Sequence, residues 1–428
     1  MTFARKSPRP FAAARAPHVR VRIYPQAPID GAARLETVVL LPRVDEVGPG
    51  PQDRRIYTID APGKLPYGND RRLVLPPWQG RTEPGAMPSA DGQFDHFAPG
   101  SAGFRLAHLY GCVRFALDVW EVYLGRQIPW HFGRDFGRLE LIAQRGWNDA
   151  QMGYGYLEVG EAPLSDGSVS DHCLNFDVIA HEVGHAMMMT FAGGFDRARV
   201  TVDYEALHEA SADWAAMIAS LHLTPVTDEL LETTQGDLDT ANRLNRFAEL
   251  SSTSQIRQAN NTRTMWDFAA GWDNEHQLAL PLVAAFFDAF VAVYKAVLVR
   301  HGAIPAALDD IAEMAERQTA WRGRARAGFA RAYARHPTRF HDALAEAREI
   351  AAAMLVAIWE RADPTRFRLG DILPILEEVD VRRFGGNLRP IVADAFVRRG
   401  IGLVTPGPRL RKPGKDSHLH SGRTVAPE

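Results

Sequence analysis

The sequence predicts an α+β protein in which a β-rich N-terminal region precedes a mostly helical remainder. Residues 1–100 are rich in proline and glycine and contain short alternating runs such as HVRVRIY and RLETVVLL, which are typical of strands joined by long loops. Beyond residue 100, apolar residues recur every three or four positions, and this spacing predicts helices. One more alternating run, RLELIAQRGW (138–147), predicts a further strand.

The helices are expected in a definite order along the chain. The first covers 101–126, and the second contains NFDVIAHEVGHAMMMTF (175–191) and ends at the glycines of AGGFD, since glycine is the usual residue after a helix. Later helices are expected at 203–221, 282–301, 305–317, 338–362 and 387–399. These elements divide the chain into a β-rich region (1–100), an α/β lobe (101–195), a helical lobe (196–408) and a disordered tail (409–428).

The composition is that of an ordinary globular protein. Of the 428 residues, 46% are hydrophobic and 24% charged, and the net charge of −3 gives no overall attraction to nucleic acid or anionic lipid. Two cysteines argue against a disulfide framework. The basic N-terminus lacks the apolar run of a secretory signal, and the apolar run 282–299 is interrupted by Asp288 and Lys295. We therefore expect a cytoplasmic protein with no nucleic-acid partner and no membrane partner.

The pentapeptide His181-Glu182-Val183-Gly184-His185 indicates a zinc site on the second helix. Histidines at positions i and i+4 project from the same face, so both imidazoles can bind one Zn²⁺ ion. The glutamate between them lies close enough to take a proton from a water molecule without binding the metal. A chance pentapeptide on a buried helix is the alternative explanation.

A catalytic zinc site needs a third protein ligand, and the sequence offers one on the following helix. The metzincin pattern would place glycine at 188 and histidine at 191, but the chain has Met188 and Phe191. DYEALHEASADWAAMIAS (203–220) instead supplies Glu209 as a ligand, with Asp213 one turn further on to accept a hydrogen bond from a ligating histidine. The many small residues around them favour close packing of the two helices.

These segments resemble the thermolysin-like zinc metallopeptidases, a family of gluzincins. DVIAHEVGHAM is similar to the central-helix motif of that family, and HEASAD is similar to its third-ligand segment. Three weaker matches follow in the family's order, namely WNDAQMGYG (147–155), TRTM (262–265) and HQLALPLVAAFF (276–287). The resemblance spans roughly residues 101–300 and implies a two-lobe fold with one catalytic zinc ion.

The resemblance implies a role for each matching residue. It implies that His181, His185 and Glu209 bind zinc, that Asp213 orients a histidine and that Glu182 is the general base. It further implies that His276 donates a hydrogen bond to the oxyanion, that Arg263 contacts a substrate carbonyl, and that a strand around Gln144–Trp147 pairs with an extended peptide. Two further candidates are Tyr204, as a second oxyanion donor, and Asp273, as the residue that orients His276.

The chain also departs from the family pattern. DNEHQLAL replaces the usual residues around the oxyanion histidine. Asp177 stands where a calcium ligand would stand, but Ser220 and its surroundings lack clustered carboxylates, so we expect calcium binding to be absent or weak. The roughly 100 residues before the matching region leave no room for both a signal and a long propeptide, which favours an intracellular member.

The predicted function is therefore a zinc endopeptidase that hydrolyses peptide or protein substrates. Two alternatives remain open at this point. One is a zinc aminopeptidase of another gluzincin branch, although no acidic motif for a substrate amine is evident. The other is a zinc-stabilised binding or scaffold protein with an inactive site.

Overall fold

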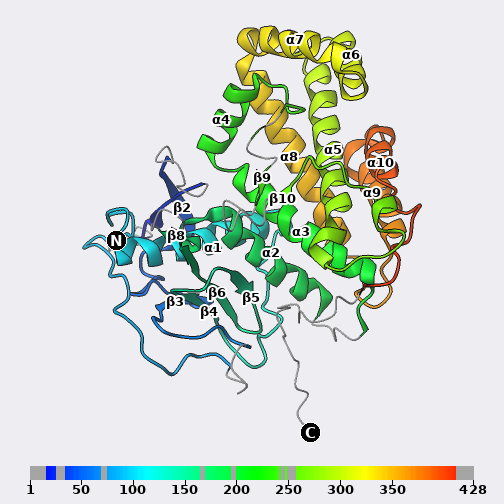
Figure 1. Cartoon of the computed structure of the whole chain (residues 1–428). Helices are drawn as coiled ribbons and strands as arrows, with labels where there is room; N and C mark the ends of the chain where they lie inside the picture. Colours follow the sequence, from blue (N-terminus) through cyan, green and yellow to red (C-terminus); the bar gives the residue numbers. More distant parts are fainter. Residues whose placement is uncertain are drawn as a thin grey trace, which may run out of the picture.

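The computed structural model describes residues 16–25, 34–68, 75–163, 169–193, 199–240, 242, 246–247 and 257–410. The strands gather at one end of the molecule and most of the helices at the other (Figure 1). The predicted α+β class is confirmed.

The N-terminal half is built on one mixed sheet and a separate strand pair. β1 (His18–Ile23) and β2 (Glu36–Arg43) pair with each other in antiparallel fashion. The sheet has the order β3-β4-β6-β5, comprising β3 (Ile56–Asp60), β4 (Leu139–Ala143), β6 (Tyr156–Val159) and β5 (Ala150–Met152). The first three of these strands run parallel, and β5 is antiparallel to β6 at the edge. A short pair, β7 (Glu161–Pro163) and β8 (Val169–Asp171), follows.

The expected boundary at residue 100 is not a structural boundary. β3 comes from the first hundred residues, yet it pairs along its whole length with β4. Lys64, from the same region, forms a buried ion pair with Glu158 on β6. Helix α1 (Ala102–Leu124) packs against β1, β2, β3 and β4. The first hundred residues and the following α/β lobe therefore share one core.

The expected edge strand around Gln144–Trp147 was placed wrongly. β4 ends at Ala143, and every residue of this strand is buried because it pairs with β3 on one side and β6 on the other. The edge of the sheet is formed by β5, after a turn that contains Trp147. Alternation in the sequence located a strand, but it did not show which strand would lie at the edge.

Capping residues set the start of helices α2 and α3 and the end of α2. α2 (Phe176–Ala192) starts after Asn175, whose side chain accepts hydrogen bonds from the backbone N–H groups of Asp177 and Val178. It ends at Gly193, whose φ of 71° is a left-handed conformation that favours glycine. α3 (Val202–Ser220) starts after Thr201, which accepts from the N–H of Tyr204.

The two helices approach each other so closely that one position between them must be glycine. A Cβ atom added at Gly184 on α2 would lie 2.7 Å from the Cα of Ala212 on α3. Ala215 and Ala216, one turn further along α3, are small as well. The glycine and the alanines therefore set the separation of α2 and α3.

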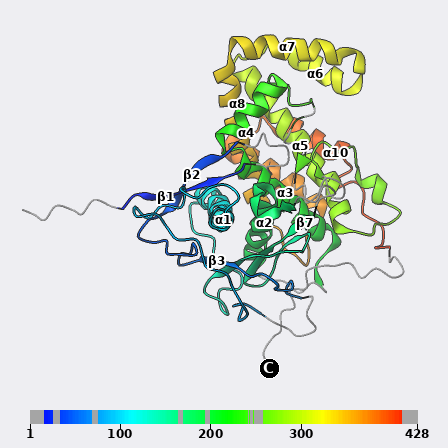
Figure 2. The ribbon, with the colours of Figure 1, turned by 60° about the vertical axis from the view of Figure 1, so that its left-hand side comes forward.

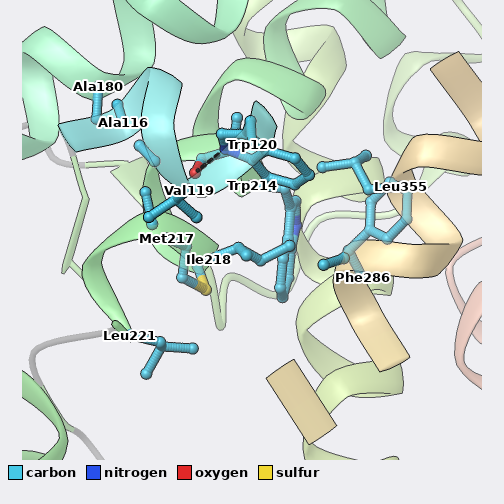
Figure 3. Close-up of a cluster of buried hydrophobic side chains, with 14 of the residues drawn as sticks. Ala116, Val119, Trp120, Ala180, Trp214, Met217, Ile218, Leu221, Phe286 and Leu355 are labelled. Atoms are coloured by element: carbon cyan, nitrogen blue, oxygen red, sulfur yellow. Dashed lines mark hydrogen bonds between the residues drawn. The ribbon is translucent and has the colours of Figure 1, made fainter. Parts of the chain in front are cut away.

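A core of large side chains joins these helices to the helical lobe (Figure 3). Trp120 of α1 donates a hydrogen bond through its Nε1 to the carbonyl of Ala215 on α3, at 3.2 Å. Trp214 of α3 donates in the same way to the carbonyl of Val283, also at 3.2 Å. Both indoles are buried with their polar groups satisfied, so they position α3 between α1 and the helices that follow.

The helical lobe agrees with the predicted order and adds elements. The expected helices correspond to α5 (Glu275–Arg300), α6 (Ala306–Arg317), α8 (Pro337–Trp359) and α10 (Arg389–Arg398). The additional elements are α4 (Thr224–Thr234), α7 (Arg322–Arg335), α9 (Ile372–Val379) and the short strands β9 (Arg246–Phe247) and β10 (Arg257–Gln258). Figure 2 shows that α6 and α7 project together at the end of the molecule away from the strands.

Two sequence-based expectations concern α5 and the C-terminal tail. Among the described helices, α5 alone is long and apolar enough to cross a membrane, and 78% of its most apolar window is buried inside the protein. This helix packs in the core, as expected.

The predicted disordered tail begins too early. Arg409 and Leu410 were placed in that tail, but they lie alongside Trp272, and Arg409 also pairs with Glu275 at 3.3 Å. The rest of that tail, 411–428, lies outside the described residues.

Replacing Gly184 with alanine should loosen the junction of α2 and α3. Because the added methyl group meets backbone atoms, we expect the overpacking to lower the free energy of unfolding by about 1–3 kcal/mol. Thermal unfolding of the purified variant measures this. Gly323→Ala on α7 is the matched control, since nothing lies within 4 Å of an added Cβ there. Equal stability of the two variants would contradict the assigned constraint.

Candidate metal centre

Two histidines of α2 face the same space one helical turn apart. The ring centroids of His181 and His185 are 4.5 Å apart, and the ring planes are nearly perpendicular, at 86°. The two residues are only 4% and 9% exposed. Imidazoles in such a place need specific partners, because burial removes the hydrogen bonds that water would supply.

Glu209 of α3 faces both histidines. Its Oε2 atom lies 3.8 Å from the Nε2 of His181, and its Oε1 atom lies 3.8 Å from the Nε2 of His185. These separations are longer than hydrogen bonds. They are close to the separation of about 3.3 Å that follows for two ligand atoms on one tetrahedral zinc ion with bonds of about 2.0–2.1 Å. The three side chains thus converge on one point.

Asp213 favours one tautomer of His181, in which the proton is on the nitrogen that points away from Glu209. The Nδ1 of His181 lies 2.8 Å from the Oδ1 of Asp213. A proton shared in this contact leaves the Nε2 with its lone pair directed at the Glu209 carboxylate. Two electron-rich atoms that face each other in a buried site are stabilised by a cation between them. Two imidazoles and a carboxylate are ligands that zinc accepts, so the residues present fit a zinc ion.

Glu182 lies beside this point and is held by the sheet. Its Oε2 accepts a hydrogen bond of 2.6 Å from the backbone N–H of Met152 on β5. One ligand atom from each of His181, Glu182 and His185 lies within 4.8 Å of the others. Glu182, which the sequence predicts to be the base, is therefore close to the predicted metal ligands and directly contacts the edge strand.

His208 is a residue of this site that the sequence argument missed. It precedes Glu209 on α3, and its ring stacks on that of His185 with a centroid separation of 4.5 Å. His185, His208 and Glu209 form a second group whose ligand atoms lie within 4.8 Å of one another. Its position directly before the predicted ligand was the available signal, but a neighbouring helical residue normally points elsewhere.

His276 reaches the site from the start of α5. Its Nδ1 lies 2.7 Å from the Oε2 of Glu209, and its side chain is 39% exposed. Asn274 accepts a hydrogen bond from the N–H of His276 and so begins the helix at this point. The predicted oxyanion histidine is thus held by Glu209. Asp273, the residue expected to orient it, is partly buried in the preceding loop, and its orienting role stays a prediction.

The three expected substrate-binding residues lie in different surroundings. Tyr204 is 1% exposed in the first turn of α3, with its ring 6.2 Å from that of His208, and burial raises the pKa of its hydroxyl. Arg263 is exposed, and its backbone N–H donates to the side chain of Asn261 while its carbonyl accepts from Arg399. Trp147 is partly buried in the turn before β5. Their roles stay predictions.

The expectation about calcium also stays a prediction. Asp177 is buried in the first turn of α2. The hydroxyl of Ser220 donates to the carbonyl of Met217 at 2.8 Å. Neither observation measures an affinity for calcium.

Known proteins offer no independent assignment. No family model matches this chain, and no curated protein matches it. The case for function therefore depends on the geometry of the site itself.

Replacing Asp213 with asparagine tests the proposed proton position. The carboxamide no longer favours the proton on Nδ1 of His181, so we expect zinc affinity to fall by about 10–100-fold. Competition with a chromogenic chelator measures the affinity. Asp310→Asn, an exposed position on α6, is the control. Unchanged affinity in Asp213→Asn would show that this carboxylate does not orient a ligand.

Proposed function

We propose that this chain is a zinc-dependent endopeptidase with the two-lobe architecture of thermolysin-like enzymes. One observation carries the proposal: the two oxygens of Glu209 each lie 3.8 Å from the Nε2 of a different histidine of the same helix. Asp213 supports it, because a buried carboxylate on the far nitrogen of His181 is the usual arrangement behind a metal-binding imidazole.

Glu182 is the proton carrier in this proposal. A zinc ion held by His181, His185 and Glu209 would supply Lewis-acid polarisation of the scissile carbonyl and would lower the pKa of a water molecule. Glu182 accepts the proton of the attacking water and then passes it to the leaving amine. The hydrogen bond from Met152 fixes one oxygen of Glu182 beside the predicted metal ligands.

The edge strand supports a peptide as the substrate. Backbone groups of successive residues in a strand point to opposite sides. The N–H of Met152 points to Glu182, whereas Gly153 and Asp149 bond with the β6 side. The carbonyl groups of Ala150 and Met152 therefore lie on the outer edge of β5. An extended peptide paired with this edge would run past Glu182.

His276 is the proposed oxyanion donor. Because Glu209 accepts from its Nδ1, a hydrogen bond to a tetrahedral oxyanion would come from Nε2 of the imidazolium form, which carries a proton on each nitrogen. Partial exposure of the ring is consistent with a residue that faces a substrate.

The contact between His276 and Glu209 also favours a second candidate function. Should His276 turn to bind the metal, the site would have four protein ligands, as structural zinc sites do. The chain would then be a zinc-stabilised binding or scaffold protein.

A peptide library distinguishes the two functions. The pure protein is incubated with mixed peptides, and the cleavage sites are identified by mass spectrometry with a chelator, without it, and after zinc is restored. Cleavage within peptides that the chelator stops and zinc restores is expected of the endopeptidase. Removal of single N-terminal residues would instead indicate an aminopeptidase, and bound zinc without cleavage would indicate the scaffold.

Replacing Glu182 with glutamine should abolish cleavage without removing zinc. An amide does not accept the proton from water, and general-base catalysis contributes about 10²–10⁴-fold. Peptidase assays and elemental analysis of the same preparation measure both properties. Turnover equal to that of the wild type would refute the assignment of the base.

Replacing His276 with alanine should lower kcat by about 10²–10³-fold, with a smaller effect on KM, because an oxyanion donor acts mainly in the transition state. Steady-state kinetics measure the two constants. Zinc content should stay at the level of the wild type. A loss of zinc in this variant would favour the four-ligand scaffold site.

A further inference from the structure

A second site candidate lies in the helical lobe, separate from the metal centre. An open cavity of about 600 Å³ is bounded by α5, α6, α7 and α10 and by the segments around Asp239 and Thr264. It shares none of the described lining residues with the metal centre. Its volume lies within the range of about 300–1,000 Å³ that small-molecule sites occupy.

The acidic groups that line this cavity are mostly paired. Lys295 of α5 contacts Asp239 at 3.3 Å and Glu316 at 2.9 Å. Glu316 also contacts Arg398 at 3.1 Å, and Arg399 contacts Asp288 at 2.8 Å. Asp288 and Lys295, the two charges that interrupt the apolar sequence of α5, therefore belong to a network of ion pairs at this cavity.

The remaining acid of the lining is Asp237. Burial raises the pKa of its carboxyl group to about 6. Its Oδ1 accepts a hydrogen bond of 3.3 Å from the N–H of Asp239, within its own loop. This carboxylate is therefore engaged by the loop backbone, and its attraction to Arg326 lowers the pKa that burial raises, although the two residues form no close ion pair.

The same cavity has arginines in excess of its acids. Arg317 ends α6, and Arg322 and Arg326 lie one turn apart on α7; all three line the cavity and are exposed. In the part of the chain that the structure describes, none of them forms a close ion pair, and the Nε of Arg322 donates to the carbonyl of Ala315 at 3.4 Å. Like charges gathered from two helices repel one another unless an anion lies between them.

The surrounding sequence cannot neutralise these charges locally. Residues 317–341 contain seven arginines and no aspartate or glutamate. Arg324 and Arg331 belong to the same helix but are absent from the described lining of the cavity. The helix therefore directs only some of its guanidinium groups into the hollow.

We propose that this cavity binds a small polyanion that carries at least two phosphate or carboxylate groups, through Arg317, Arg322 and Arg326. Guanidinium groups bind both kinds of oxyanion through paired hydrogen bonds, so the two share one recognition chemistry. A hollow bounded by helices fits a compact ligand better than an extended polymer.

Occupancy of this site is connected to the segment that carries Arg263. The Nη1 of Arg399 donates to the carbonyl of Asn261 at 2.7 Å and to that of Arg263 at 3.2 Å. The N–H of Met265 donates back to the carbonyl of Arg399 at 2.8 Å. Arg399 therefore connects the lining of the cavity to this segment, and a ligand that binds only the folded chain raises the midpoint of thermal unfolding.

Titration calorimetry of the full chain with inorganic pyrophosphate and with citrate tests the proposal. We expect the double variant Arg322→Gln/Arg326→Gln to bind at least about tenfold more weakly, because each charged hydrogen bond that is lost is worth about a tenfold change or more. Arg324→Gln/Arg331→Gln removes the same charge from the same helix and is the matched control, for which we expect binding within about twofold of the wild type, a change under 0.5 kcal/mol.

Each outcome decides the proposal. Selective loss in the cavity variant supports it, and preference for pyrophosphate or for citrate identifies the phosphate or the carboxylate class. Equal weakening in both variants would show only general attraction to a basic helix. That result, or no binding of either probe to the wild type at millimolar concentration, overturns the site. The measurement does not depend on peptidase activity, so its failure leaves the proposed function unaffected.

Discussion

The close approach of α2 and α3 is the constraint on which the candidate metal centre depends. Gly184 stands between the two histidines of the motif, and its missing side chain lets the backbone of Ala212 come near. Only at this separation do the oxygens of Glu209 lie 3.8 Å from both imidazoles. The two buried tryptophans, through bonds to backbone carbonyls, hold α3 in this position from the other side. The arrangement of the candidate metal ligands therefore depends on the packing of α2 against α3.

Electrostatics then determine what the packed site can hold. Asp213 lies 2.8 Å from one nitrogen of His181, and an oxygen of Glu209 lies 3.8 Å from the other. Burial makes this arrangement of electron-rich atoms costly in the absence of a cation. Glu209 also contacts His276, so the same carboxylate that would bind the metal positions the residue proposed for the oxyanion. The helical lobe presents the opposite case, in which the arginines that line a cavity outnumber its acids.

Much of this site was predictable because its signals are local. The spacing of His181 and His185 follows from helical periodicity, and Glu209 and Asp213 follow from the same periodicity on the next helix. Their convergence in the structure agrees with that prediction. His208 was missed because the side chains of two adjacent residues on a helix normally point in different directions. The edge strand was misplaced because an alternating sequence does not show which neighbours a strand will have.

The sequence by itself determined the α+β class, the helix that carries the motif, and the shared helix face of His181 and His185, since these depend on short-range periodicity and residue chemistry. Tertiary structure alone decided that β5 forms the edge beside Glu182, that the first hundred residues share the sheet of the following lobe, and that arginines of α6 and α7 gather at one cavity. The first two outcomes depend on which strands pair, and the third depends on how α5 and α10 pack against α6 and α7, so none of them leaves a periodic mark on its own segment.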